Sequence, residues 1–124
     1  DRRENIRRVG AVAELFAAAG LVTLVAFVSP YRADRALERE KIEASRKGSF
    51  IEVFVDAPLE VCEARDPKGL YRQARAGALS QFTGVDDPYE PPLNPELRLD
   101  AAKYPPQVLA EQVLACLRNL KKIS

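Results

Sequence analysis

The sequence predicts an α/β fold in which a parallel sheet carries helices on both faces. Two continuous apolar runs rich in β-branched residues, LVTLVAFV at 21–28 and FIEVFVD at 50–56, are typical of strands buried on both faces. Segments with helical periodicity precede, separate and follow these runs. The resulting alternation of helix and strand favours a parallel sheet within one domain or part of one.

The first half of the chain gives a clear order of elements. From Glu4 to Ala19 apolar residues recur at helical spacing, and Gly20 follows where a helix C-terminus favours glycine. The apolar run at 21–28 then predicts a strand. We expect Ser29 to cap the next helix and Pro30 to take its first position, with this charged helix ending at Gly48.

The second half repeats the pattern. After the strand at 50–56, Pro58 opens a helix that reaches Arg65. A proline-rich connector covers 86–96, LRLD at 97–100 predicts a short strand, and a final amphipathic helix covers 105–120. Ligands of such sheets bind beyond the carboxyl ends of the strands, which here are the segments 28–30 and 56–58.

Composition excludes several classes of function. Nineteen basic against eighteen acidic residues give a net charge of +1, which argues against nucleic acid or a membrane surface as the partner. No run is long enough to span a bilayer. Histidine, the commonest metal ligand and general base, is absent, and we assign no metal ligand to the chain. Cys62 and Cys116 are predicted to be reduced core thiols, which suits a cytoplasmic protein, with a disulfide or metal pair as the alternative.

Two segments carry candidate anion-binding residues. Ser29 follows a strand and precedes a helix, where its hydroxyl and the backbone amides favour anions. The alternative is a plain helix cap. In DRRENIRR, Arg2, Asn5 and Arg8 fall on one helical face that suits an anion or a ribose, and the alternative is an exposed helix end.

The segment 65–84, RDPKGLYRQARAGALSQFTG, gathers cations with little apolar content. Lys68, Arg72 and Arg75 are spaced by four and three, so one helical face would present three positive charges. Glycines on either side resemble hinges, and Phe82 adds an aromatic ring. Such a combination suits a phosphate and a purine together, although a charged run is also typical of a solvated helix face.

The order of these blocks carries a resemblance to a known family. DRRENIRR, FVSPYRADR, FVDAPLEVCEARDPKGLY, ARAG and FTGVDDPYEPPLNPE together resemble adenylylsulfate kinases, also called APS kinases. KGLY followed by ARAG and FTG is specific to that family. The resemblance implies a P-loop kinase fold and transfer of the γ-phosphoryl group of MgATP to the 3′-hydroxyl of adenosine 5′-phosphosulfate. The product would be 3′-phosphoadenosine 5′-phosphosulfate.

The resemblance also implies roles residue by residue. Residues at about 66–90 would form a lid. Ser29 matches a serine described in the family as a phosphoserine intermediate. We favour a positioning role for Ser29, because in-line phosphoryl transfer needs no covalent intermediate. The residues matched to adenylylsulfate binding are Arg2, Asn5, Val28, Ser29, Pro30, Lys68 and Phe82, and those matched to ATP binding are Arg65, Arg72, Arg75 and Thr83.

Two departures from the family pattern leave alternatives open. The string G-x-x-x-x-G-K-[ST] occurs nowhere in the 124 residues, which predicts a partial domain whose N-terminal part is missing and which is inactive by itself. Ala78 and Ser80 replace a glutamate and a lysine of the lid pattern, which removes one cation.

The main alternative is a non-catalytic kinase-like domain that regulates a fused ATP sulfurylase by binding 3′-phosphoadenosine 5′-phosphosulfate. A different small-molecule kinase, such as a shikimate or nucleoside kinase, is a weaker alternative. The family's partners allow a fused ATP sulfurylase domain and a homo-oligomer. Its cofactor would be Mg²⁺ bound with ATP.

Overall fold

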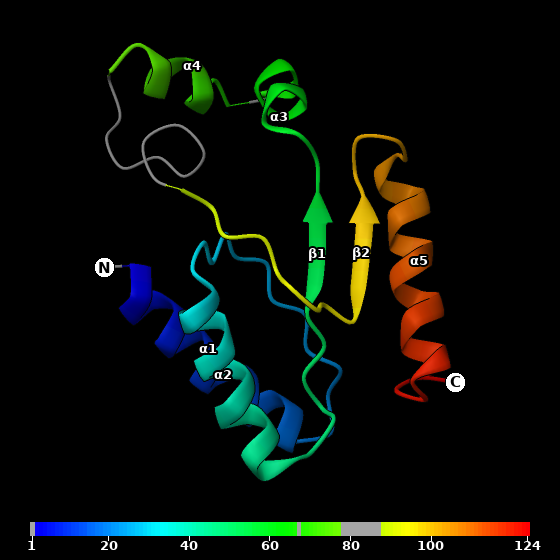
Figure 1. Ribbon diagram of the computed structural model, residues 1–124. Helices are drawn as coiled ribbons and strands as arrows, with labels where there is room; N and C mark the ends of the chain where they lie inside the picture. Colours follow the sequence, from blue (N-terminus) through cyan, green and yellow to red (C-terminus); the bar gives the residue numbers. More distant parts are fainter. Residues whose placement is uncertain (1, 67, 78–87) are drawn as a thin grey trace. The chain divides into compact units, whose positions relative to one another are not determined.

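The computed structural model describes residues 2–66, 68–77 and 88–124. The chain divides into two compact units, residues 1–51 and 52–124. The elements in chain order (Figure 1) are α1 (Arg2–Ala18), α2 (Arg32–Ser45), β1 (Val53–Asp56), α3 (Leu59–Arg65), α4 (Leu70–Arg75), β2 (Leu97–Asp100) and α5 (Pro106–Asn119).

The first unit is built on the packing of α1 against α2. Gly10 allows a close approach, because a Cβ at that position would lie 2.1 Å from Oε2 of Glu38. At the C-terminal end of α1, the Arg46 guanidinium donates hydrogen bonds of 2.8 Å to the carbonyls of Ala17 and Ala18. These are among the last carbonyls of α1, which have no partner within their own helix. Arg46, the residue that follows α2, therefore supplies donors to the C-terminal carbonyls of α1.

The strand predicted at 21–28 is not found. The one sheet among the described residues contains β1 and β2, and residues 21–28 have no strand assignment. Their apolar side chains are exposed, most of all Leu24 at 76%. An apolar run indicates a preference for burial, but a strand forms only where a neighbouring strand pairs with its backbone groups. That pairing is absent for this run in the described part of the chain.

The start of α2 also differs from the prediction. Tyr31, not Ser29, is the N-cap, with the extended φ of −106° and ψ of 129° that a cap requires. Ser29 has a positive φ of 43°, which is incompatible with the cap conformation. Pro30 lies before the helix and is fully buried. The helix ends at Ser45, because Arg46 is extended.

The second unit contains the parallel sheet. β1 and β2 pair in parallel register from Val53↔Leu97 to Asp56↔Asp100, and α5 packs against β2 (Figure 1). Leu99 of β2 and Ala101, which follows it, are buried, and Ala74 of α4 is buried as well. The parallel α/β arrangement and the short strand at 97–100 are as predicted, whereas the strand predicted from residue 50 begins at Val53.

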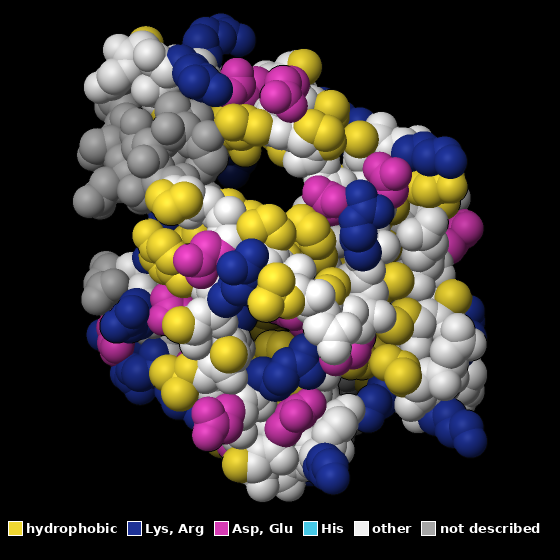
Figure 2. All heavy atoms as spheres, in the orientation of Figure 1, with side chains coloured by type: hydrophobic (Ala, Val, Ile, Leu, Met, Phe, Trp, Pro, Cys, Tyr) yellow, Lys and Arg dark blue, Asp and Glu magenta, His cyan; other side chains and the backbone are white. Residues whose placement is uncertain are grey.

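Two remaining features concern the surface and the thiols. No helix among the described residues is long and apolar enough to cross a membrane. Figure 2 shows basic and acidic side chains interspersed over the region of α2. Cys62 and Cys116 are free thiols, as predicted, but the predicted core position is wrong, because both are only partly buried.

Candidate functional site

The first turn of α1 presents Arg2 and Asn5 as exposed side chains. Glu4, between them, accepts hydrogen bonds from Arg7 at 2.8 and 2.6 Å and from Arg8 at 3.1 Å. The bonds from Arg7, followed by that from Arg8, lower the pKa of Glu4 from 4.5 to about 2. Arg8 is thus engaged within the helix, which separates it from the predicted set of Arg2, Asn5 and Arg8.

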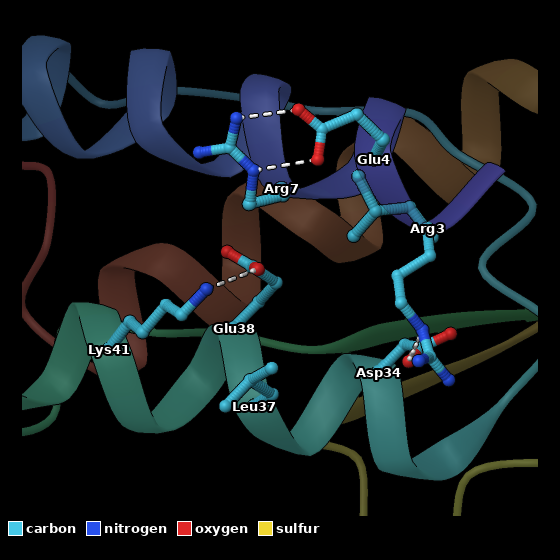
Figure 3. A pocket seen from close by; sticks show the side chains of 8 residues that line it. Arg3, Glu4, Arg7, Asp34, Leu37, Glu38 and Lys41 are labelled. Carbon is cyan, nitrogen blue, oxygen red and sulfur yellow. Dashed lines mark hydrogen bonds and ion pairs between the residues drawn. The ribbon is translucent and has the colours of Figure 1, made fainter. Parts of the chain in front are cut away.

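Charged residues of α2 line a cleft of about 130 Å³ against this turn (Figure 3). Asp34 pairs with Arg3 at 3.2 Å, and Glu38 accepts a hydrogen bond from Lys41 at 3.4 Å. Both carboxylates belong to buried residues, at 8% and 9% exposure. Sequence reasoning missed them, although their spacing of four in a charged helix places them on one face.

The segment 28–30 lies in the same unit and is held by a residue of α2. Ser29 holds its unusual positive φ while its carbonyl accepts a hydrogen bond of 2.5 Å from Nη1 of Arg35. Pro30 is buried beside it, and Val28 is exposed. Ser29 itself is half-buried. The segment is therefore held by its neighbours, with the serine next to the beginning of a helix.

In the second unit, Arg65 joins the end of α3 to the turn that follows β2. Its guanidinium donates to the carbonyl of Ala101 at 2.6 Å and to that of Ala102 at 3.4 Å. Because these residues follow the carboxyl end of β2, Arg65 lies where parallel sheets bind ligands.

The cations of α4 are arranged differently from the prediction. Lys68 precedes the helix, which starts at Leu70 after Gly69 adopts the left-handed conformation. The predicted face of three cations is therefore wrong, because only Arg72 and Arg75 belong to α4. Arg75 is paired with Glu63 of α3, and this bond raises the pKa of Arg75.

Asp66 fixes the start of α4. Its two carboxylate oxygens accept hydrogen bonds of 3.2 Å from the backbone amides of Tyr71 and Arg72. These amides have no acceptor within the helix, and the carboxylate also favours the positive end of the helix dipole. The sequence pattern predicted no separate role for Asp66.

The carboxyl ends of β1 and β2 carry two aspartates that the sequence reasoning did not single out. Asp56 accepts a hydrogen bond of 2.7 Å from Arg98 of the neighbouring strand. Asp100 accepts one of 3.1 Å from the amide of Lys103. Both carboxylates are therefore engaged within the unit. The predicted residues Phe82 and Thr83, and the replacements Ala78 and Ser80, lie outside the described residues.

A parallel sheet with basic side chains beyond its strand ends defines the class of α/β proteins that bind anionic ligands at that edge. Comparison with known proteins then gives the family. The family model "Adenylylsulphate kinase" matches residues 1–100, and the chain belongs to this family.

Individual relatives agree with this assignment. The adenylyl-sulfate kinase of Marinobacter nauticus is 52% identical over 123 residues, which are 99% of this chain and 60% of that protein. A bifunctional enzyme CysN/CysC of Xylella fastidiosa is 58% identical over 117 residues, 94% of this chain and 18% of that protein. The chain thus spans about 60% of the length of the Marinobacter relative.

A solved structure extends the likeness to three dimensions. The Mycobacterium tuberculosis APS kinase CysC, described as a complex with AMPPNP and APS, superposes with a TM-score of 0.88 at 47% identity. The match covers 95% of this chain and 67% of that one. The predicted P-loop kinase-like α/β fold is confirmed by this match.

Proposed function

We propose that the full-length polypeptide containing this chain transfers the γ-phosphoryl group of ATP to the 3′-hydroxyl of adenosine 5′-phosphosulfate. The products are 3′-phosphoadenosine 5′-phosphosulfate and ADP. The observation that carries the proposal is the 47% identity and TM-score of 0.88 to a kinase described with both a nucleotide analogue and APS. The segments predicted to bind substrate fall inside the residues matched to the family.

In this proposal the first unit binds the acceptor. Arg2 and Asn5 contact adenosine 5′-phosphosulfate from the first turn of α1, where the helix dipole also favours an anion. The segment 28–30 supplies the second contact, with Ser29 orienting the acceptor. In-line transfer depends mainly on positioning, so a serine whose backbone is held in place suits this role better than that of a covalent carrier.

The second unit supplies cations for the nucleotide. Arg65, at the end of α3, is proposed to contact ATP together with Arg72 and Arg75. Lys68 is proposed to contact the acceptor, and Lys68, Arg72 and Arg75 belong to a proposed lid at about 66–90. Charge develops on the phosphoryl oxygens during transfer, and fixed cations stabilise it. Since Arg75 is paired with Glu63 in this structure, it must exchange that partner for a phosphate when the nucleotide binds.

Mg²⁺ is proposed as the ion that accompanies ATP. The described residues contain no group of three or more acidic, cysteine or histidine side chains placed to hold a metal. Asp56 and Asp100 are engaged by other groups, so this part of the chain does not provide a cage of its own. Mg²⁺ commonly binds substrate phosphates with few protein carboxylates, and it neutralises charge on the β- and γ-phosphates.

The location and the partners remain proposals. The two free thiols suit a reducing cytoplasm. The bifunctional Xylella relative supports fusion to a second sulfate-activating domain as an arrangement for the full-length polypeptide. Homo-oligomer formation stays a prediction.

The test is turnover by the full-length polypeptide. With MgATP and adenosine 5′-phosphosulfate, we expect ADP and 3′-phosphoadenosine 5′-phosphosulfate in equal amounts by chromatography. The matched control is the 3′-deoxy analogue, which lacks the accepting hydroxyl and should give no product. Residues 1–124 alone are expected to give no turnover, because they contain no glycine-rich phosphate-binding string.

Other outcomes have a definite meaning. ATP hydrolysis that does not depend on adenosine 5′-phosphosulfate would contradict the proposal. Tight binding of 3′-phosphoadenosine 5′-phosphosulfate without turnover would instead fit the regulatory alternative.

A further inference from the structure

We propose that Asp34 and Arg35, adjacent residues in the first turn of α2, are positioning residues for the acceptor site. Asp34 fixes the first turn of α1, and Arg35 fixes the conformation of Ser29. We call them the positioning pair. The inference rests on the proposed function for its kinetic consequences, but the geometry behind it is independent of that function.

The ion pair of Asp34 with Arg3 restrains the first turn of α1. Its carboxylate lies 3.2 Å from Nε of Arg3, and the Asp34 residue is only 8% exposed, whereas the Arg3 side chain is 76% exposed (Figure 3). A nearly buried carboxylate is costly to leave without a partner, so the pair holds the Arg3 end of α1 at a fixed rotation. Arg3 follows Arg2 directly and precedes Asn5 by two residues, so that rotation determines where both point.

The hydrogen bond of Arg35 restrains the segment 28–30. Ser29 has a φ of 43°, a region that costs a residue with a Cβ about 1 kcal/mol or more. Such a conformation persists only where the surroundings hold it. Arg35 does so by donating to the Ser29 carbonyl at 2.5 Å, a bond strengthened by the charge of the guanidinium.

Helix geometry lets neighbouring residues serve two different segments. Consecutive side chains on a helix diverge by about 100°, so Asp34 and Arg35 leave α2 in different directions. One reaches α1, and the other reaches back to residue 29. The first turn of α2 thereby sets the geometry of the two predicted acceptor-binding segments, although neither residue of the pair needs to touch the acceptor.

The kinetic test uses the full-length polypeptide with Asp34→Asn and Arg35→Gln. We expect each variant to raise the KM for adenosine 5′-phosphosulfate about two- to fivefold, the range of one charged contact that is partly exposed to solvent. The KM for MgATP should not change. Arg3→Gln changes the exposed member of the same ion pair, so it should also raise this KM. The double variant Arg3→Gln/Asp34→Asn should raise the KM by less than the product of the two single effects, because both substitutions remove the same contact.

Two control variants lie on the same helix. Glu43→Gln removes a carboxylate that pairs with Arg39 at 3.4 Å, and Arg39→Gln removes a guanidinium that donates to the carbonyl of Phe50 at 3.5 Å. These contacts have the same chemistry but lie away from the predicted acceptor site. Both controls should leave the KM for adenosine 5′-phosphosulfate unchanged, and a rise equal to that of the positioning pair would overturn the inference.

A second measurement separates the inference from the proposed function. Amide hydrogen exchange should become faster at residues 6–8 in Asp34→Asn and at residues 29–31, except Pro30, in Arg35→Gln, with little change elsewhere. Unchanged exchange at those residues would overturn the positioning role whether or not the protein is an active kinase. A wild-type protein without turnover, but with these exchange changes in the variants, would contradict the proposed function and leave the positioning role supported.

Discussion

Gly10 is the residue whose substitution tests the packing of α1 against α2 most directly. In an ordinary exposed helix, Gly→Ala stabilises by about 1 kcal/mol, because alanine loses less backbone freedom on folding. Here the new Cβ would lie 2.1 Å from Oε2 and 2.9 Å from Cδ of Glu38. Non-bonded atoms normally stay about 3.5 Å apart, so the Glu38 carboxylate must retreat by roughly 1 Å or more.

That retreat has a cost. Glu38 is 9% exposed and accepts a hydrogen bond from Lys41, so it has little room and a partner to lose. We expect the cost to cancel the gain from helix propensity, which leaves Gly10→Ala neutral or destabilising. In a Glu38→Ala background the obstacle is gone, and the same substitution should stabilise by about 1 kcal/mol. The coupling between the two sites is then about 1 kcal/mol.

The assay is urea unfolding of the four proteins of this double-mutant cycle, each in the full-length polypeptide. Ala11→Gly at an exposed position of the same helix supplies the propensity scale without a steric term. If Gly10→Ala stabilises equally in both backgrounds, the close approach of Gly10 and Glu38 does not limit this helix pair and the reasoning is wrong.

Three further predictions concern single residues. The folded-state pKa of Glu4 is lowered from 4.5 to about 2, chiefly by the hydrogen bonds from Arg7. The stabilising contribution of Glu4 is therefore complete above about pH 4.5 and is lost as the pH falls towards 2. Carbon-detected NMR of the Glu4 carboxyl should show this titration, and a midpoint near pH 4.5 would refute the prediction. Arg65→Ala should speed amide exchange in the turn after Ala101 and raise the KM for MgATP, because it removes the hydrogen bonds to the carbonyls of Ala101 and Ala102. Arg65→Lys should have an intermediate effect, because it retains one donor centre. Unchanged amide exchange in Arg65→Ala would show that Arg65 does not hold this turn. Gly69→Ala should lower the free energy of unfolding by about 1 kcal/mol, because the φ of 67° at this position disfavours a residue with a Cβ. Gly69→Asn should cost less, because asparagine tolerates the left-handed conformation better than alanine does. Equal costs for the two variants would show that the backbone conformation is not the cause.

Local patterns predicted the helices well. The periodicity from Glu4 indicated α1, and Pro58 and Pro105 marked the starts of α3 and α5 within a residue or two. Helical spacing and prolines act over a few residues, so the chain itself carries this information. The order of the sequence blocks likewise indicated the family that the comparison over residues 1–100 confirmed.

Features that depend on distant partners were not predictable in the same way. The run 21–28 has the composition of a buried strand but pairs with no strand in the described part of the chain. Ser29 has the residue type of a helix cap, yet its carbonyl is held by Arg35 in a conformation that excludes capping. Lys68 has the spacing of a helical face but lies before the helix, because Gly69 turns the backbone first.

By itself the sequence determined the family, the positions of the main helices and the residue types available for binding anions, since these follow from local composition and from the order of motifs. Only the tertiary structure decided which distant charges are already engaged: Asp34 with Arg3, and Arg75 with Glu63. Electrostatic pairing depends on distances of a few ångströms in space, and residues far apart along the chain reach those distances only after the helices have packed.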